Sequence, residues 1–290
     1  MSQVYLNGAF MAPEEARISP LDRGFLFADG IYEVIPAYNS VLFRFDEHLE
    51  RLERSLQEVE IGNPHERLQW QALCEELVAR NGGGNLSVYL QITRGAATKR
   101  DHAFPDPPVA PTVFMMTSPI AVPAADSPDT ASGGKAITRD DTRWARCDIK
   151  SISLLPNILL RQQAVASGAV EAVLLRDGLV TEGAASNLFT VHNGEVSTPP
   201  HSARILGGIT RDLVVELCAK HGLPFAEREV TEAQLRQAEE IWITSSTREV
   251  VPITQLNEAP VGNGKPGAMW KTLARHYVNF KRRLCGQEQE

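Results

Sequence analysis

A proline-rich stretch near the middle of the chain limits the folds that this sequence can adopt. Seven prolines lie between Pro105 and Pro128, and a polar, glycine-containing segment follows at residues 129–134. Proline fixes the backbone angle φ and has no N–H to donate, so this stretch predicts loops and a linker with at most one short strand, at residues 112–117. The 290 residues are therefore expected to form two domains, 1–118 and 135–290, joined by a Pro/Gly-rich linker at 119–134.

Hydrophobic periodicity predicts the elements of each half. Leucines spaced by three and four predict an amphipathic helix over 46–60, with a second helix over 66–80 and strands over 31–35 and 86–93. In the second half we expect a strand over 147–155 and helices over 157–167, 210–221 and 269–284. Strands mixed irregularly with helices indicate an α/β or α+β fold and not a regular βαβ repeat.

Charge and composition exclude several classes of protein. The formal net charge of −7 gives the chain no overall attraction for nucleic acid or for an anionic membrane surface. The sequence has no run of about 18 apolar residues that would span a membrane, and its first residues do not resemble a signal peptide. The four cysteines form no CxxC pair, which argues against a zinc ribbon and favours free thiols in the cytoplasm.

Lys150 is the first candidate for chemistry. It lies in a β-rich segment, where a strand would place it on the same face as Ile152 and Leu154. An apolar face disfavours the charged amine and lowers its pKa, which is what a Schiff-base nucleophile requires. The alternative is a strand-end lysine whose amine extends to water.

Two segments have the composition of an anion-binding site. Gly207 and Gly208 precede a predicted helix, and they allow an anion to approach the free N–H groups at the helix start, where Thr210 would be both cap and ligand. The hydroxyl-bearing residues 245–247, with Ser246 at their centre, follow a predicted strand over 241–244. Ordinary polar turns are the alternative for both segments.

Arg51 and Glu182 complete the set of candidates. Arg51 shares a helix face with His48 and Ser55, where an arginine is usually solvated unless a phosphate lies nearby. Glu182 lies in a turn of small residues that can approach a ligand ring. A buried lysine, a phosphate site, an arginine and a carboxylate are together what pyridoxal phosphate needs, since the lysine forms the Schiff base and the carboxylate pairs with the pyridinium nitrogen.

The candidates lie within longer motifs that are specific in combination. These motifs are Asp22-Arg23-Gly24-Phe25, Asp29 to Val34, Arg146 to Ser151, Thr181-Glu182-Gly183, Ser186-Asn187, Gly208 to Arg211 and Thr244 to Thr247. With them the sequence resembles the fold-type IV pyridoxal-phosphate aminotransferases over nearly its whole length, and within them the D-amino-acid transaminases. The resemblance implies a two-domain α/β (α+β) fold with the cofactor between the domains.

The resemblance also implies a role for each candidate. Lys150 would be the Schiff-base lysine and the catalytic residue, and Glu182 would pair with the pyridine nitrogen. Leu206 would pack against the cofactor ring. The phosphate would be held by Arg51, Ile209, Thr210 and Ser246.

Substrate recognition depends on fewer residues. In D-amino-acid transaminases a tyrosine, an arginine and a histidine bind the substrate α-carboxylate, and the last two come from a loop of the partner subunit. The matching residues are Tyr32, Arg100 and His102, which implies an obligate homodimer. The alternative is that Arg100 and His102 are ordinary exposed loop residues. Arg248 departs from the expected small or polar residue and Ala28 from a common glycine, and Arg248 puts the substrate range in doubt.

The implied reaction is ping-pong transamination between D-alanine and 2-oxoglutarate, giving pyruvate and D-glutamate, in a cytoplasmic enzyme that binds neither nucleic acid nor membrane. One alternative is a branched-chain L-amino-acid aminotransferase, which usually has a Phe-Glu-Gly-Ile-Arg type motif around position 32 and lacks the Arg100 and His102 pair. Others are an aminodeoxychorismate lyase, which needs no oxo acid, and an (R)-selective amine transaminase.

Overall fold

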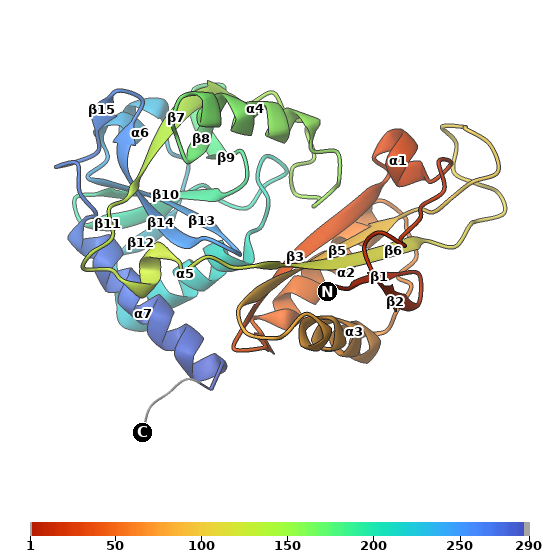
Figure 1. The fold of residues 1–290 in the computed structure, drawn as a ribbon. Coiled ribbons are helices and arrows are strands. Elements are labelled where there is room, and N and C mark those ends of the chain that lie inside the picture. The colour runs from red at the N-terminus through yellow and green to blue at the C-terminus, as the bar shows by residue number, and fades with distance from the viewer. Residues whose placement is uncertain (1, 287–290) are drawn as a thin grey trace. The chain divides into compact units, whose positions relative to one another are not determined.

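The computed structural model describes residues 2–286 of the chain, and they form two compact units (Figure 1). The first unit comprises residues up to 120 together with 149–154, and the second comprises 121–148 and 155 onward. Residues 149–154 therefore lie in the first unit, although the sequence assigned them to the domain 135–290. The outer ends of the expected domains, residue 1 and residues 287–290, lie outside the described residues.

The first unit is an antiparallel sheet covered by two helices. Its elements are β1 (Val4–Leu6), β2 (Ala9–Met11), α1 (Arg23–Phe27), β3 (Gly30–Tyr38), β4 (Val41–Leu42), α2 (Phe45–Glu58), α3 (Arg67–Arg80), β5 (Leu86–Thr93) and β6 (Thr112–Pro119). The strand order is β2-β1-β6-β5-β3-β4. The leucines at positions 49, 52 and 56 are buried in α2, as their spacing predicts.

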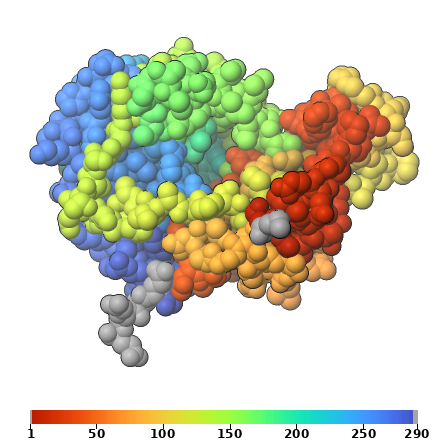
Figure 2. All heavy atoms as spheres, viewed as in Figure 1, coloured from red at the N-terminus to blue at the C-terminus, as the bar shows by residue number. Residues whose placement is uncertain are grey.

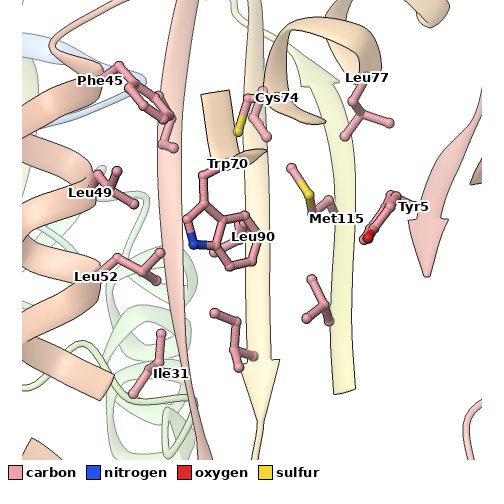
Figure 3. Close-up of a cluster of buried hydrophobic side chains, with 14 of the residues drawn as sticks. Tyr5, Ile31, Phe45, Leu49, Leu52, Trp70, Cys74, Leu77, Leu90 and Met115 are labelled. Carbon is pink, nitrogen blue, oxygen red and sulfur yellow. The ribbon is translucent and has the colours of Figure 1, made fainter. Parts of the chain in front are cut away.

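Figure 3 shows how the core of this unit is built. Side chains from α2, such as Leu49 and Leu52, point across the sheet strands toward Trp70 and Cys74 of α3. Leu90 of β5 lies beside the Trp70 ring, and each of these five residues is at most 2% exposed. Burial of a large apolar side chain stabilises the fold by about 1.5–3 kcal/mol. This core fixes α2 against β3, and these two elements carry several of the candidate residues.

The second unit is a nine-stranded mixed sheet with helices around it. Its elements are the 3-10 helix Ala124–Asp126, β7 (Gly134–Asp140), α4 (Leu155–Ala166), β8 (Glu171–Arg176), β9 (Leu179–Gly183), β10 (Asn187–His192), β11 (Glu195–Thr198), α5 (Ile209–His221), β12 (Phe225–Glu227), α6 (Glu232–Gln237), β13 (Glu240–Ser245), β14 (Glu249–Leu256), β15 (Ala259–Pro260) and α7 (Ala268–Leu284). The strand order is β12-β11-β10-β13-β14-β7-β8-β9, with β15 on β14.

Much of the expected linker packs onto the second unit. The proline-rich segment reaches this unit at residue 121, and the yellow-green chain in Figure 2 crosses its surface. Lys281 of α7 donates to Asp126 over 2.5 Å and to Glu249 over 2.7 Å, and Ala125 is fully buried. These contacts hold the segment against α7. Within residues 2–286, no helix is both long and apolar enough to cross a membrane.

Candidate active site

Lys150 is held against the start of β3 in the first unit. The N–H of Tyr32 donates to the carbonyl of Lys150 over 3.0 Å, and the N–H of Ile152 donates to the carbonyl of Gly30 over 3.1 Å. The half-buried Lys150 side chain places Nζ 4.2 Å from the centroid of the Tyr32 ring. The structure therefore brings together the predicted nucleophile and one predicted substrate-binding residue.

The strand predicted over 147–155 is wrong. Within this range only Ser151 forms a β-bridge, to Ile31. The N–H of Ser151 donates to the carbonyl of Ile149 over 2.8 Å, and the N–H of Leu154 donates to that of Ile152 over the same distance. Hydrogen bonds between residues two apart form tight turns, and these turns prevent a continuous strand. Lys150 therefore lies in an irregular segment and not on a strand face.

Arg51 is not a solvated helix arginine. It is 4% exposed, and its Nε and Nη2 donate to the two carboxylate oxygens of Glu33 over 2.7 and 2.8 Å. His48 Nδ1 lies 2.9 Å from the same carboxylate. Burial alone would raise the pKa of Glu33, but the Arg51 guanidinium and the His48 hydrogen bond hold it well below its usual value. Burial lowers the pKa of His48, so the imidazole is neutral at pH 7.

Arg100 and His102 lie together on the loop between β5 and β6. Both side chains are exposed. The ring of Phe27 lies 4.8 Å from the Arg100 guanidinium and 5.2 Å from the His102 ring. In the described part of the chain, no hydrogen bond or ring contact joins either residue to Tyr32, whose ring stacks on Tyr89 at 5.7 Å.

Glu182 is a buried carboxyl at the end of β9. It is 4% exposed, and it accepts from the N–H of Leu206 over 3.1 Å and from Asn187 Nδ2 over 3.0 Å. Arg143 Nη1 also donates to this carboxylate. Burial raises the pKa of Glu182 to about 7, against the opposing effect of Arg143. Glu182 and Leu206 are thus in direct contact in the second unit.

Asp141 competes with Glu182 for the same arginine. Two nitrogens of Arg143 donate to Asp141 over 2.9 Å each, and Arg176 lies 3.2 Å from the same carboxylate. Burial alone would raise the pKa of Asp141, but Arg143 holds it below its usual value. Glu182 shares its cation with a second anion, so one more positive partner would stabilise its ionised form.

The start of α5 has the form of an anion site. Gly208 occupies the N-cap position without a side-chain cap, and helix residues Ile209 and Thr210 follow. Thr210 was expected to be the cap, but it lies inside the first turn and is 5% exposed. A Cβ at Gly208 would lie 1.9 Å from Asn187 Oδ1, so only glycine fits here. The first N–H groups of a helix and its dipole attract anions.

Ser246 directly follows β13. Thr244 of this strand pairs with Asn187 of β10, the residue that lies against Gly208, and α5 packs on β13.

Arg248 does not extend into open space. Its Nη1 donates to the carbonyl of Val170 over 3.0 Å and its Nη2 donates to buried Glu171 over 2.6 Å. These contacts make Arg248 the counter-ion of a buried carboxylate.

Sequence reasoning missed three residues of these clusters. Glu33 lies on the same face of β3 as Ile31 and Ile35, and it is fully buried. A charge between two apolar residues on one strand face was a visible signal of a buried ion pair. Arg143 and Asp141 lie in an irregular segment, and no periodicity pointed to them. Arg143 and Asp141 contact Glu182 and Thr181 of β9 because their loop folds back onto this strand.

Comparison with known proteins adds three findings on sequence. The model of the family described as amino-transferase class IV matches residues 30–256. A D-alanine aminotransferase of Bacillus licheniformis is 41% identical over 93% of this chain and 94% of its own length. Another D-alanine aminotransferase, from Listeria monocytogenes, is 37% identical over 98% of each chain.

Solved structures share the whole fold. A branched-chain amino acid aminotransferase from T.th., solved with pyridoxamine 5'-phosphate, has a TM-score of 0.86 and 27% identity, covering 99% of this chain and 95% of that one. The branched-chain aminotransferase of Thermoproteus uzoniensis with norvaline has a TM-score of 0.84 and 25% identity, covering 99% and 96%. The expected two-domain fold with mixed α and β structure is confirmed.

Proposed function

This chain belongs to the amino-transferase class IV family, and from that premise we propose that it transfers the amino group of D-alanine to 2-oxoglutarate. It is a pyridoxal-phosphate-dependent aminotransferase of fold type IV, related to enzymes that act on D-amino acids. The observation that carries the proposed substrate is that one exposed loop presents the guanidinium of Arg100 and the imidazole of His102 beside the same Phe27 ring. A guanidinium fork with a neighbouring imidazole donor suits an α-carboxylate.

The residues present fit the cofactor. When bound, pyridoxal phosphate supplies an aldehyde that condenses with amines and a ring that withdraws electrons. Glu182 has a pKa of about 7 because it is buried, and a ring nitrogen that carries a proton would be a further cation beside Arg143 for this carboxyl. Lys150 would hold the aldehyde carbon, and Leu206 would pack on the ring.

We infer that the phosphate would be held by backbone N–H groups and a guanidinium. The N–H groups of Ile209 and Thr210 belong to the uncapped first turn of α5, and Ser246 would add a hydroxyl. Glu33 fixes the plane of the Arg51 guanidinium through two hydrogen bonds. An arginine that is already oriented loses less conformational entropy when it binds a phosphate.

Proton transfer falls to Lys150. Nζ of Lys150 would take the proton from the substrate α-carbon as general base and would give it back as general acid. The turn at 149–151 and the hydrogen bond from the N–H of Tyr32 hold the Lys150 backbone beside β3. The first oxo acid is released before the second one binds and the cycle runs backward, which predicts ping-pong kinetics.

Assembly is part of the proposal. We infer a homodimer in which the loop with Arg100 and His102 reaches the neighbouring active site. This inference rests on the likeness to D-amino-acid transaminases. Tyr32 would contribute the third contact to the substrate carboxylate from the chain that also supplies Lys150.

The test of the mechanism is Lys150→Ala, compared with Lys220→Ala at the exposed end of α5. We expect the first variant to lose transamination of D-alanine by at least about a thousandfold, while the second keeps it. The measurement is pyruvate release with 2-oxoglutarate present and absent. Product formation by Lys150→Ala at a near wild-type rate would refute the mechanism. Pyruvate release from aminodeoxychorismate without any oxo acid would favour the lyase.

The test of the substrate is a titration of the holoenzyme with D-alanine and, separately, with L-leucine. Loss of the visible absorbance band with D-alanine alone supports the proposal. Loss with L-leucine alone would retain Lys150 and the cofactor but replace the proposed substrate with a branched-chain L-amino acid. The branched-chain alternative follows from solved structures of similar fold that are branched-chain aminotransferases.

A further inference from the structure

We propose that Arg23 is a positioning residue for the substrate site. Its guanidinium fixes the backbone of the loop 98–104 and so orients Arg100 and His102, which determine how tightly a carboxylate is bound. This inference rests on the proposed function, because it takes these two side chains as the carboxylate-binding pair. All the contacts that support it lie within the first unit.

The guanidinium of Arg23 is almost fully used by hydrogen bonds. Nη1 donates to the carbonyls of Asp101 and Ala103 over 2.6 and 3.1 Å, and Nη2 donates to the carbonyl of His102 over 3.2 Å. Nε donates to Asp29 over 2.7 Å. A single side chain therefore binds three successive carbonyls of the loop, on the C-terminal side of Arg100.

These bonds form away from water. Arg23 is 4% exposed, although the three loop residues whose carbonyls it binds are all exposed. Hydrogen bonds from a charged donor are stronger where water does not compete. Figure 2 shows the red atoms of the α1 region against the pale yellow atoms of this loop. The loop is thus attached through its backbone to a buried cation.

Asp29 joins this cation to a second one. It accepts from Arg23 and, through both oxygens, from Arg94 over 2.9 and 3.1 Å. Burial alone would raise the pKa of Asp29, but Arg94 and Arg23 hold it below its usual value. Arg94 also donates to the carbonyls of Val59 and Glu60 over 2.6 and 2.8 Å. The cluster therefore connects the loop to the end of α2.

Aromatic rings complete the attachment on both sides of the loop. Phe27 of α1 lies 5.0 Å from the Arg23 guanidinium and also contacts Arg100 and His102. Phe104, at the other end, lies 3.6 Å from the Arg94 guanidinium. Cation–π contacts of this kind add to the hydrogen bonds and restrict the side chains directly.

The geometry of α1 leaves little freedom for Arg23. The side chain of Asp22 caps this helix by accepting from the N–H of Gly24 over 2.8 Å, and it also accepts from the Thr93 and Thr112 hydroxyls. A Cβ at Gly24 would lie 2.2 Å from Thr93 Cγ2. The helix is therefore packed directly onto β5, and Arg23 leaves it at a fixed point.

The experiment compares the holoenzyme with Arg23→Met, Arg23→Lys and Arg100→Ala. Arg17→Met is the matched control, because the exposed Arg17 also donates to a backbone carbonyl, that of Ala16, but only one residue away. The readouts are kcat and KM for D-alanine, retention of the visible cofactor absorbance, and hydrogen exchange of the peptide that covers residues 98–104. Phe104→Ala, at an exposed side chain, tests the same attachment if Arg23→Met does not fold.

We expect Arg100→Ala to raise KM by about tenfold or more without faster exchange in the loop, because it removes only a charge-assisted contact. Arg23→Met should raise KM by about fivefold with kcat within about twofold, since the lost contact acts on binding. It should also speed exchange at 98–104 and keep the cofactor. KM and loop exchange in Arg23→Lys should lie between those of the wild type and of Arg23→Met, because an ammonium keeps the charge but not the planar set of donors of a guanidinium. Phe104→Ala should show the same changes to a smaller degree.

The outcomes separate the two proposals. If Arg100→Ala raises KM and Arg23→Met, or Phe104→Ala in its place, leaves both KM and loop exchange at the wild-type level, the positioning role is overturned while the proposed function stands. If Arg100→Ala leaves KM unchanged, the carboxylate-binding pair itself is wrong, and the inference falls with it. The inference would also be contradicted if Arg23→Lys raised KM as much as Arg23→Met but left hydrogen exchange of the loop at the wild-type level.

Discussion

The clusters around Glu33 in the first unit and Glu182 in the second are built from the same parts but behave oppositely. Each is a buried glutamate bound by an arginine. The pKa of Glu33 lies well below its usual value, whereas that of Glu182 is raised to about 7. Burial pushes both pKa values upward, so the difference comes from their partners.

The partners differ in how they are shared. Arg51 gives two hydrogen bonds to Glu33, and His48 adds a third. Arg143 divides its donors between Glu182 and Asp141, and Asp141 is itself a negative neighbour. Glu33 is thus already neutralised and orients Arg51. Glu182 shares Arg143 with Asp141, so its charge is only partly neutralised, which is the property expected of a residue that pairs with a protonated ring nitrogen.

The largest expected effect is on stability, from Glu33→Gln. It leaves the Arg51 guanidinium buried without its anion, and breaking one side of a buried pair costs about 3–5 kcal/mol. The measurement is the free energy of unfolding from denaturant titration at pH 7. Glu47→Gln is the control, because Glu47 is 38% exposed in its pair with Arg44 and should cost at most about 1 kcal/mol. Equal losses in both variants would contradict the comparison.

Glu182→Gln should show the reverse pattern. We expect kcat/KM for D-alanine to fall by about 100- to 1000-fold, since an electrostatic contact to a reacting system is lost. The free energy of unfolding at pH 8 should stay the same or rise, because burial makes the charged carboxyl costly and the neutral amide removes that cost. Glu195→Gln, in the exposed pair with Arg228, serves as control. A stability loss as large as that of Glu33→Gln would break the contrast.

The two glutamates should also give opposite pH dependence of stability. Glu182 has a raised pKa in the folded protein, so its contribution is fully present below its ordinary value of 4.5 and is lost as the pH rises to about 7. That loss is roughly 3 kcal/mol, at 1.36 kcal/mol per pKa unit. Glu33 has a lowered pKa, so it stabilises the fold above pH 4.5 and loses this contribution as the pH falls below it.

Each slope is obtained by subtracting the unfolding free energy of the corresponding Gln variant from that of the wild type at each pH. The cofactor-free protein is used, because a ligand bound only to the folded state would add its own free energy. Two curves with slopes of the same sign between pH 3 and 7.5 would rule out the proposed difference in partners.

The smallest expected effect is that of Asp141→Asn. Removing this anion leaves more of the Arg143 guanidinium to Glu182, so the pKa of Glu182 should fall by about one unit, equivalent to 1.4 kcal/mol. The midpoint of the Glu182-dependent stability curve measures the change. Asp177→Asn is a suitable control, because Asp177 is 72% exposed in its pair with Arg204. An unchanged or higher midpoint would show that Asp141 does not raise the pKa of Glu182.

The sequence by itself determined the family, the mixed fold and most helices. Periodic leucines predicted α2 because burial on one face requires that spacing, and the two glycines before α5 marked its start because a Cβ at Gly208 has no room. The motif residues identified the candidates without any structure. The role of each remains a proposal, because sequence position alone does not measure charge or contact.

Only the tertiary structure decided which charges meet. Lys150 appeared to lie on a strand, but its turns depend on pairing with β3, which is distant in sequence. Arg248 appeared only as a departure that put the substrate range in doubt, but it neutralises Glu171. In the sequence Arg23 was only one residue of a motif, but in the structure its side chain binds the backbone of a loop 78–80 residues away. Periodicity records which face of an element is buried, whereas ion pairs depend on where distant segments come together in space.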